Sequence, residues 1–145
     1  HRGAFVFVAG KPKSGTLEKN VDVAVIAEDF ARIGEIAAFW RTAADRVHVF
    51  ESGLDPDGDD VAVYGAGFYG AFIRACLARP ERICCILDQN PFLLGNDVNG
   101  VPVIEPADLP PGVGTLLVGL NPAHARNIIE DIPSLAKREL DYFFL

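Results

Sequence analysis

Three glycines with the spacing of a dinucleotide-binding turn stand near the middle of the chain, in the run 65–70. They follow an apolar segment and open a segment with helical spacing, which is the context that such a turn needs. The first glycine permits a tight turn, the second lets the backbone approach a phosphate, and the third lets helix and strand pack closely. We predict that Gly65, Gly67 and Gly70 face a nucleotide or nucleotide-sugar. The alternative is a turn that has lost its ligand and only shapes the fold.

Three polar residues are expected at the same edge of the sheet. Asp88 follows the apolar run 83–87, where an acidic residue accepts hydrogen bonds from ribose hydroxyls. Asn90 stands in the loop after it, and Asn121 follows a later strand. We predict that Asp88 and Asn90 contact a ribose or sugar hydroxyl and that Asn121 joins them. For Asp88, a carboxylate that caps a helix or forms a turn is an equal alternative.

The histidines and cysteines could also do chemistry, but the sequence places no activating residue or further metal ligand beside them. His48 and His124 stand in helical segments without an Asp or Cys placed to activate them. Cys76, Cys84 and Cys85 lack the spacing of metal ligands. Because Cys84 and Cys85 are adjacent in a predicted strand, their side chains should point to opposite faces. We therefore predict no catalytic residue and no metal site in this chain.

Short apolar segments alternate with helical segments from Val61 onward. Such strands indicate a parallel sheet covered on both faces. Asn121 is expected to cap a helix that begins at Pro122. The predicted fold class is α/β, a Rossmann-like and mostly parallel sheet of about five strands with flanking helices. The strands are expected at 61–64, 83–87, 101–104, 115–118 and 142–144, the helices at 68–78 and 122–132, and a helical turn at 106–109.

Residues 1–60 are expected to form an arm before this domain, which spans residues 61–145. The arm should hold a strand at 5–8, a helix at 22–50 and a linker at 52–60. The run 10–16 looks like a phosphate-binding loop but lacks the Lys after its second glycine, so we reject that interpretation. The helix should bury one apolar face, with Phe39 and Trp40 in the core. That face is formed by Ile26, Phe30, Ile33, Ile36, Ala37 and Trp40.

Composition narrows the class of partner. The chain has 145 residues, half of them hydrophobic and 23% charged, with a net charge of −7. A negative chain repels the phosphate backbone, so nucleic acid is not expected as a partner. Apolar runs are too short to span a membrane, and because the start at His1 lacks an apolar run of sufficient length, no signal peptide is expected. We expect a cytoplasmic piece of a longer protein, and the sequence allows a homo-oligomer.

The same residues resemble a known family. The runs Tyr64–Gly67 and Asp88–Pro91, then Gly95, Gly100–Ile104 and Pro106, are similar to the C-terminal domain of S-adenosylmethionine-dependent sugar C-methyltransferases. This resemblance implies a Rossmann-like lobe that helps to hold the nucleotide-sugar substrate. It covers residues 61 to about 132.

The N-terminal arm also resembles this family, whereas two positions in the domain differ from it. The strand 5–8 with Lys11-Pro12 resembles the final strand of a class I methyltransferase domain, and the helix 22–50 matches the connecting arm. Family members typically carry a Lys in the turn and another after the Asn-Pro pair. Here those regions hold Phe68-Tyr69 and the run 92–94, so phosphate binding would depend on backbone N–H groups.

The resemblance implies a substrate-binding lobe that is not catalytic alone. Whether the chain belongs to an enzyme is left open, because S-adenosylmethionine and the catalytic residues would be held by an upstream methyltransferase domain. One alternative is an oxidoreductase domain that binds NAD through the same turn. Another is an interaction or regulatory module with an empty turn, in which the aromatic tail 142–145 docks a partner instead of forming a buried last strand.

Overall fold

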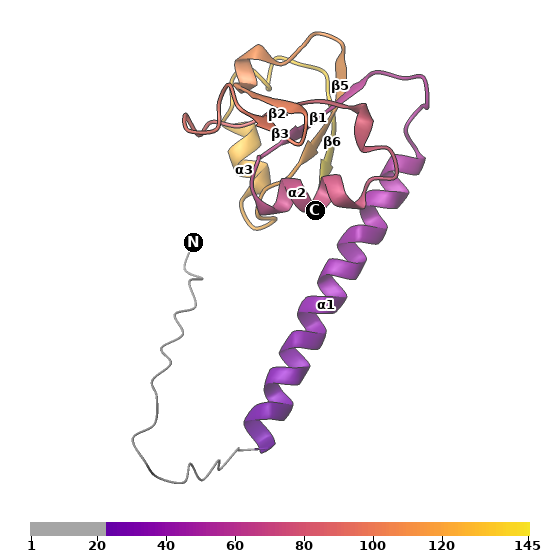
Figure 1. The fold of residues 1–145 in the computed structure, drawn as a ribbon, viewed down its shortest axis with the longest axis vertical. Coiled ribbons are helices and arrows are strands. Elements are labelled where there is room, and N and C mark those ends of the chain that lie inside the picture. Colours follow the sequence, from indigo (N-terminus) through magenta and orange to yellow (C-terminus); the bar gives the residue numbers. More distant parts are fainter. Residues whose placement is uncertain (1–22) are drawn as a thin grey trace. The chain divides into compact units, whose positions relative to one another are not determined.

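The computed structural model describes residues 23–145 (Figure 1). Two compact units divide after Glu35, and the sheet belongs to the second, Ile36–Leu145. The long helix α1, Val23–Ser52, crosses this division. The predicted strand at 5–8 and the turn-rich run 10–16 lie outside the described residues. Among the described helices, none combines the length and hydrophobicity needed to cross a bilayer.

The fold is α/β, with a six-stranded, mostly parallel sheet in the order β3-β4-β2-β1-β5-β6. Every neighbouring pair is parallel except β3 with β4. The prediction of about five strands missed only β3, which pairs with β4 across Asn99 and Gly100, both at positive φ. The strands are β1 Asp60–Tyr64, β2 Ile83–Leu87, β3 Asp97–Val98, β4 Val101–Ile104, β5 Val113–Val118 and β6 Asp141–Phe144.

Short helices connect the strands. The helix α2, Phe68–Cys76, joins β1 to β2 through the 3₁₀ turn η1, Pro80–Arg82. A second 3₁₀ turn, η2 Pro106–Asp108, follows β4. The helix α3, Ala125–Glu130, lies between β5 and β6.

The predicted start of α3 is wrong by three residues. Its N-cap is His124, not Asn121. The reason is local, because the backbone oxygen of Asn121 accepts hydrogen bonds from the N–H groups of His124 and Ala125. These bonds close a separate turn at residues 122–124 before the helix begins.

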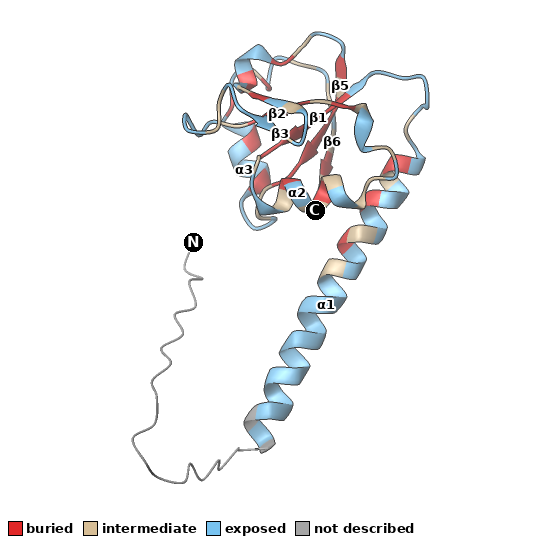
Figure 2. Ribbon diagram, viewed as in Figure 1, coloured by how far each residue is buried: buried red, intermediate tan, exposed pale blue. Residues whose placement is uncertain are grey.

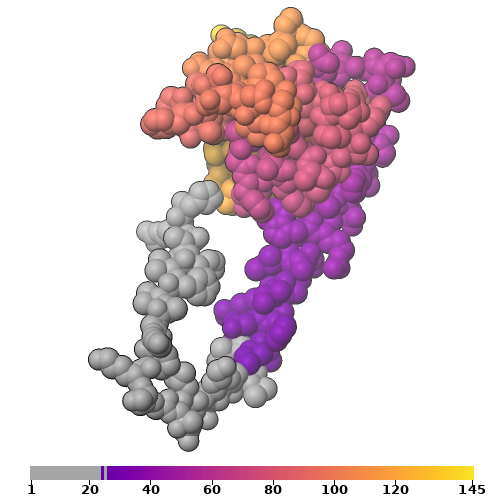
Figure 3. Space-filling view, viewed as in Figure 1, coloured from indigo at the N-terminus to yellow at the C-terminus, as the bar shows by residue number. Residues whose placement is uncertain are grey.

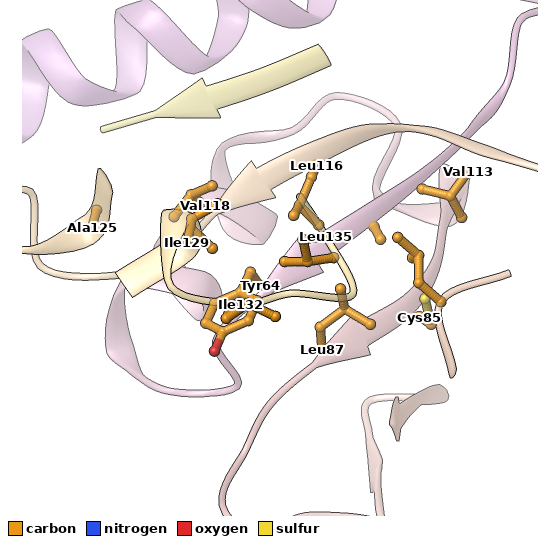
Figure 4. Close-up of a cluster of buried hydrophobic side chains, with 12 residues drawn as sticks. Tyr64, Cys85, Leu87, Val113, Leu116, Val118, Ala125, Ile129, Ile132 and Leu135 are labelled. Atoms are coloured by element: carbon orange, nitrogen blue, oxygen red, sulfur yellow. The ribbon is translucent and has the colours of Figure 1, made fainter. Parts of the chain in front are cut away.

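Two hydrophobic clusters cover the sheet, and its central strands β1, β2 and β5 are the most buried elements (Figure 2). The first cluster joins Tyr64, Leu87 and Leu116 from three neighbouring strands to Ile132 and Leu135 (Figure 4). The second joins the other strand face to α1 and α2, through Ala43, Val47 and Ile73. Burial of one such aliphatic side chain stabilises the fold by roughly 1.5–3 kcal/mol.

The predicted burial of one α1 face is wrong for most of its length. Phe30 is 70% exposed, Ile33 59%, Ile36 58% and Phe39 45%. Packing begins at Trp40, whose ring lies 4.6 Å from that of Phe72. The spacing identified the helix correctly, but helical periodicity alone does not say where along a helix a partner surface lies.

The adjacent cysteines do not point to opposite faces as predicted. Val61 pairs with Ile83 and Ala62 pairs with Cys85, so Cys84 is an extra residue in β2. This bulge interrupts the alternation of side chains. Cys85 is buried in the first cluster, and Cys84 packs against the same cluster.

Candidate functional site

The three predicted glycines stand in a bend of the backbone, residues 65–70, which we call the glycine bend. It lies at the junction of β1 and α2, where the carboxyl ends of the neighbouring strands β1, β2 and β5 meet. Gly65 has a φ of +97°, which L side chains rarely adopt. Its N–H donates to the carbonyl oxygen of Leu87 at the end of β2, over 2.7 Å. The N–H of Gly119, just after β5, donates to the carbonyl oxygen of Tyr64 over 2.8 Å. These two hydrogen bonds fix the bend to both neighbouring strands.

The backbones of Gly65, Gly70 and Gly119 lie in close contact at the base of the bend. A Cβ on Gly70 would lie 1.9 Å from the carbonyl oxygen of Gly65, and a Cβ on Gly65 would lie 2.6 Å from that of Gly119. A Cβ on Gly119 would meet the Cα of Gly70 at 2.4 Å. The turn and packing roles of Gly65 and Gly70 therefore hold in the structure. The sequence analysis missed Gly119, although its position directly after a buried strand was a usable signal.

The tip of the bend is open. Gly67 is exposed, and a Cβ built on it would have no atom within 4 Å. It is the N-cap of α2, and no side chain caps the helix. Within residues 23–145, the N–H groups of Gly67 and Phe68 have no protein acceptor. These donors are therefore available to an external acceptor at the positive end of a helix dipole.

Asp88 closes one side of the bend. Its Oδ2 accepts a hydrogen bond from the N–H of Ala66 over 2.8 Å, and its Oδ1 accepts one from the N–H of Asn90 over 2.9 Å. One N–H of the bend is therefore already used by the protein. Because a carboxylate offers about four acceptor positions, the group can still accept hydroxyl donors. The bond from Oδ1 to Asn90, two residues on, also makes Asp88 the turn-forming carboxylate of the alternative interpretation.

Asn90 and Asn121 form turns of the same kind. The Oδ1 of Asn90 accepts from the N–H of Phe92 over 3.1 Å, and that of Asn121 accepts from the N–H of Ala123 over 3.0 Å. In each case the side chain bonds the backbone two residues on, which is a typical Asx turn. Asn90 is exposed and Asn121 is half-buried. Their side-chain oxygens shape the loops after β2 and β5, and among residues 23–145 neither NH₂ group donates to a protein acceptor.

Tyr64 lies under the bend at the end of β1. Burial raises the pKa of Tyr64 to about 12, and the negative charge of Asp88 contributes to this rise. Its hydroxyl therefore stays protonated at neutral pH. The sequence analysis missed this link between Asp88 and the core. An acidic residue placed one strand away from a buried Tyr was the only signal available.

Aromatic rings flank the first turn of α2. Phe68 is 67% exposed, and its ring lies edge-on to that of Trp40, with centroids 5.3 Å apart. Tyr69 lies 5.7 Å from both rings. An acceptor at the bend would therefore meet backbone N–H donors with aromatic rings beside them.

A cleft of about 540 Å³ lies elsewhere in this unit, between α2 and the turn that joins β3 to β4. Arg74 lines it, and the Nη2 of Arg74 donates to the carbonyl oxygen of Val98 over 3.0 Å. The segments between α2 and β5 form much of the surface seen in Figure 3. None of the six predicted ligand residues lines this cleft.

The two histidines within the described residues lie in different segments of the fold. His48 in α1 and His124 before α3 are both exposed. In the described part of the chain, no group of three or more His, Cys, Asp or Glu side chains is arranged to hold a metal ion.

Comparison with known proteins gives no relative from which a role could be taken. No family model, no curated protein and no solved structure matches this chain.

Proposed function

We propose that the glycine bend binds the diphosphate of a nucleotide-sugar and that the domain is the substrate-binding lobe of an S-adenosylmethionine-dependent methyltransferase. The order of the five parallel strands, β4-β2-β1-β5-β6, supports a Rossmann-like fold, because dinucleotide-binding domains use the same 3-2-1-4-5 order. In such sheets, ligands bind outside the carboxyl ends of the strands, which is where the bend lies.

The observation that carries the proposal is the open tip of the bend. A Cβ built on Gly67 would have no atom within 4 Å. Gly67 is the N-cap residue of α2, and no side chain accepts a hydrogen bond from the N–H groups at that end of the helix. A phosphate oxygen placed there accepts from the N–H groups of Gly67 and Phe68. Hydrogen bonds to a charged acceptor are worth about 1.5–3 kcal/mol each, so two of them can support measurable binding without a lysine.

Asp88 takes the part of the acid that binds the ribose. Its carboxylate stands beside the bend, held by Ala66 and Asn90. Ribose hydroxyls donate to its remaining lone pairs, and the amide groups of Asn90 and Asn121 offer N–H donors to a sugar. The same negative charge repels a second anion, so it favours a ligand whose phosphates sit at Gly67 and Phe68 and whose hydroxyls face Asp88.

Substitution of Gly67 tests the proposal without disturbing the fold. Its φ of −82° suits any residue, and a side chain there has open space. Asp and Asn are both good N-caps, so Gly67→Asp and Gly67→Asn should keep or slightly raise stability. We expect calorimetry with a nucleoside-diphosphate sugar to show binding to the native chain. Gly67→Asp should weaken it at least tenfold, and Gly67→Asn should weaken it less.

The same titration separates the alternatives. NAD binding, with no binding of nucleoside-diphosphate sugars, would favour an oxidoreductase domain, for which the position of Asp88 after β2 is also suitable. Equal binding by both Gly67 variants and the native chain would place the ligand elsewhere. No binding of either ligand would leave the bend as a structural turn and favour an interaction module.

Catalysis is assigned to groups outside this chain. The proposed lobe holds substrate, and S-adenosylmethionine with the catalytic residues would belong to an upstream methyltransferase domain. We expect no methylated product when the 145-residue chain is mixed with S-adenosylmethionine and nucleotide-sugars. Turnover by this chain would contradict the assignment.

A further inference from the structure

Two adjacent thiols face the same side of the sheet because of a β-bulge. The register between β1 and β2 shifts at this point, so Cys84 has no partner in β1 while Cys85 pairs with Ala62. The Cys85 side chain belongs to the first hydrophobic cluster, and the Cys84 side chain packs against it. Both thiols are free, and Cys85 is buried while Cys84 is partly exposed.

The sulfur atoms of the pair are 3.7 Å apart, in an S–H···S contact. A disulfide needs a separation of about 2.05 Å, so the pair is far from that geometry. Two thiolates bound to one tetrahedral ion at about 2.3 Å lie about 3.8 Å apart. A three-coordinate pyramidal atom has narrower bond angles than a tetrahedral ion, so it holds two sulfurs somewhat closer together than this. The observed separation is therefore slightly longer than a single bridging thiophilic atom requires, and a small approach of the two side chains closes the difference.

The surroundings restrict which atom this can be. A closed zinc site needs four protein ligands, and within residues 23–145 no third His, Cys, Asp or Glu joins the pair in a metal-binding group. Trivalent arsenic that carries one organic group completes its three bonds with only two thiolates. We propose that Cys84 and Cys85 form a bidentate binding site for monosubstituted trivalent arsenicals.

The reaction is a substitution without change of oxidation state. In water the arsine oxide takes up one water molecule and carries two hydroxyl groups on arsenic. Two arsenic–sulfur bonds then form and the two arsenic–oxygen bonds break, and each leaving hydroxide takes one thiol proton and departs as water. Cys84 reacts first because it is the more exposed. Its hydrogen bond with Cys85 also lowers the pKa of the Cys84 thiol, against the opposing effects of burial and of Asp60. Cys85 then closes the ring.

This site is independent of the proposed nucleotide site, which lies at the opposite end of the strands. The probe is phenylarsine oxide, added to the full chain and followed by intact mass in non-denaturing buffer. We expect one arsenical per chain that survives excess glutathione and is removed by dithiothreitol. Cys76→Ala is the matched control and should bind equally, since the pair is intact. Cys84→Ala and Cys85→Ala should lose the glutathione-resistant adduct.

Thermal unfolding distinguishes binding to a site in the native state from reaction of two thiols in the unfolded chain. A site that is preformed in the native state raises the melting temperature when it is occupied. We expect a rise for the native chain and for Cys76→Ala, and none for Cys84→Ala, which changes a partly exposed residue and should fold. An equal adduct on Cys84→Ala, two arsenicals per chain, no adduct, or a fall in melting temperature would each overturn the proposal.

Discussion

At the scale of single residues, the bend depends on glycines that leave no room for a side chain. Gly65, Gly70 and Gly119 contact one another through backbone atoms alone. Gly67 differs, because it stands in open space. The four glycines therefore fall into three that pack the bend and one that keeps its tip accessible.

Among the described glycines, Gly70 should be the one that tolerates substitution by alanine least. Its Cβ would lie 1.9 Å from the carbonyl oxygen of Gly65, which is backbone and cannot rotate away. Overpacking of this kind typically costs about 1–3 kcal/mol and occasionally more, and we expect at least the upper end. Urea unfolding measures the loss. Gly112→Ala is the control, since its Cβ would meet only Asp60 at 4.0 Å, and an equal loss there would refute the packing argument.

The phenol of Tyr64 should make stability depend on alkaline pH. Its pKa is raised in the native state from about 10 to about 12, so the unfolded chain loses this proton first. The native state is then favoured fully below pH 10, and this contribution falls as the pH rises from 10 to 12. Tyr64→Phe should flatten that part of the stability curve.

Asp88 provides the control for Tyr64. Because its charge contributes to the raised pKa, Asp88→Asn should lower the pKa of Tyr64 in a spectroscopic titration of tyrosinate. Burial also raises the pKa of Tyr142, so Tyr64→Phe should remove one of two late-titrating tyrosines. If both remain in that variant, another residue is responsible.

At the scale of elements, the sequence predicted structure that depends on one segment alone. It did not predict structure that depends on how two segments pair. The ranges of β2 and β4 match the predicted strands, because continuous apolar residues bounded by turn formers identify buried parallel strands. The two-residue strand β3 was missed because it has no hydrophobic pattern of its own. The bulge at Cys84 was missed because register depends on the neighbouring strand, which one segment does not encode.

The candidate site shows the same division. The spacing of Gly65, Gly67 and Gly70 predicted a bend at a strand-to-helix junction, and the structure has it there. The hydrogen bond from Ala66 to Asp88 and the contact of Gly119 with Gly70 could not be predicted, because they join segments that are far apart in the sequence.

Glu51 fixes the end of α1 to the segment between α2 and η1. Its two carboxylate oxygens each accept a backbone N–H, from Ala78 and from Arg79, both over 2.8 Å. The side chain is buried. Glu51→Gln replaces one acceptor by an NH₂ group that faces an N–H donor, and we expect a loss of about 2 kcal/mol. Glu139→Gln, at an exposed position, should change the free energy of unfolding by less than about 0.5 kcal/mol.

Arg138 holds the loop before β5. Its guanidinium donates to the carbonyl oxygens of Leu109 at 3.0 Å and Pro110 at 2.8 Å, with longer bonds to Pro111 and Val113. A lysine ammonium cannot reproduce this planar fork, so Arg138→Lys should lose about 1–3 kcal/mol in urea unfolding.

The exposed Arg41 supplies the control for this loop. Arg41→Lys should have little effect, and equal losses at the two positions would show that the loop contacts of Arg138 do not matter.

At the scale of the whole sheet unit, the fold brings its polar turns to one edge. The bend after β1, Asp88 after β2 and Asn121 after β5 all follow parallel strands that are neighbours in the sheet. The remaining edge of β6 is partly closed by Arg46, whose Nη2 donates to the carbonyl oxygen of Phe144 over 2.6 Å. The aromatic tail is thus the last strand of the sheet, with Phe143 and Leu145 buried.

The most direct measurement is a two-dimensional amide NMR titration of the native chain with a nucleoside-diphosphate sugar. The account predicts saturable shifts of the Gly67 and Phe68 amide resonances, because a phosphate accepts from those N–H groups. Gly112 should stay unshifted as an internal reference. Saturable shifts confined to the cleft beside Arg74, or no shift at the bend with ligand in large excess, would contradict it.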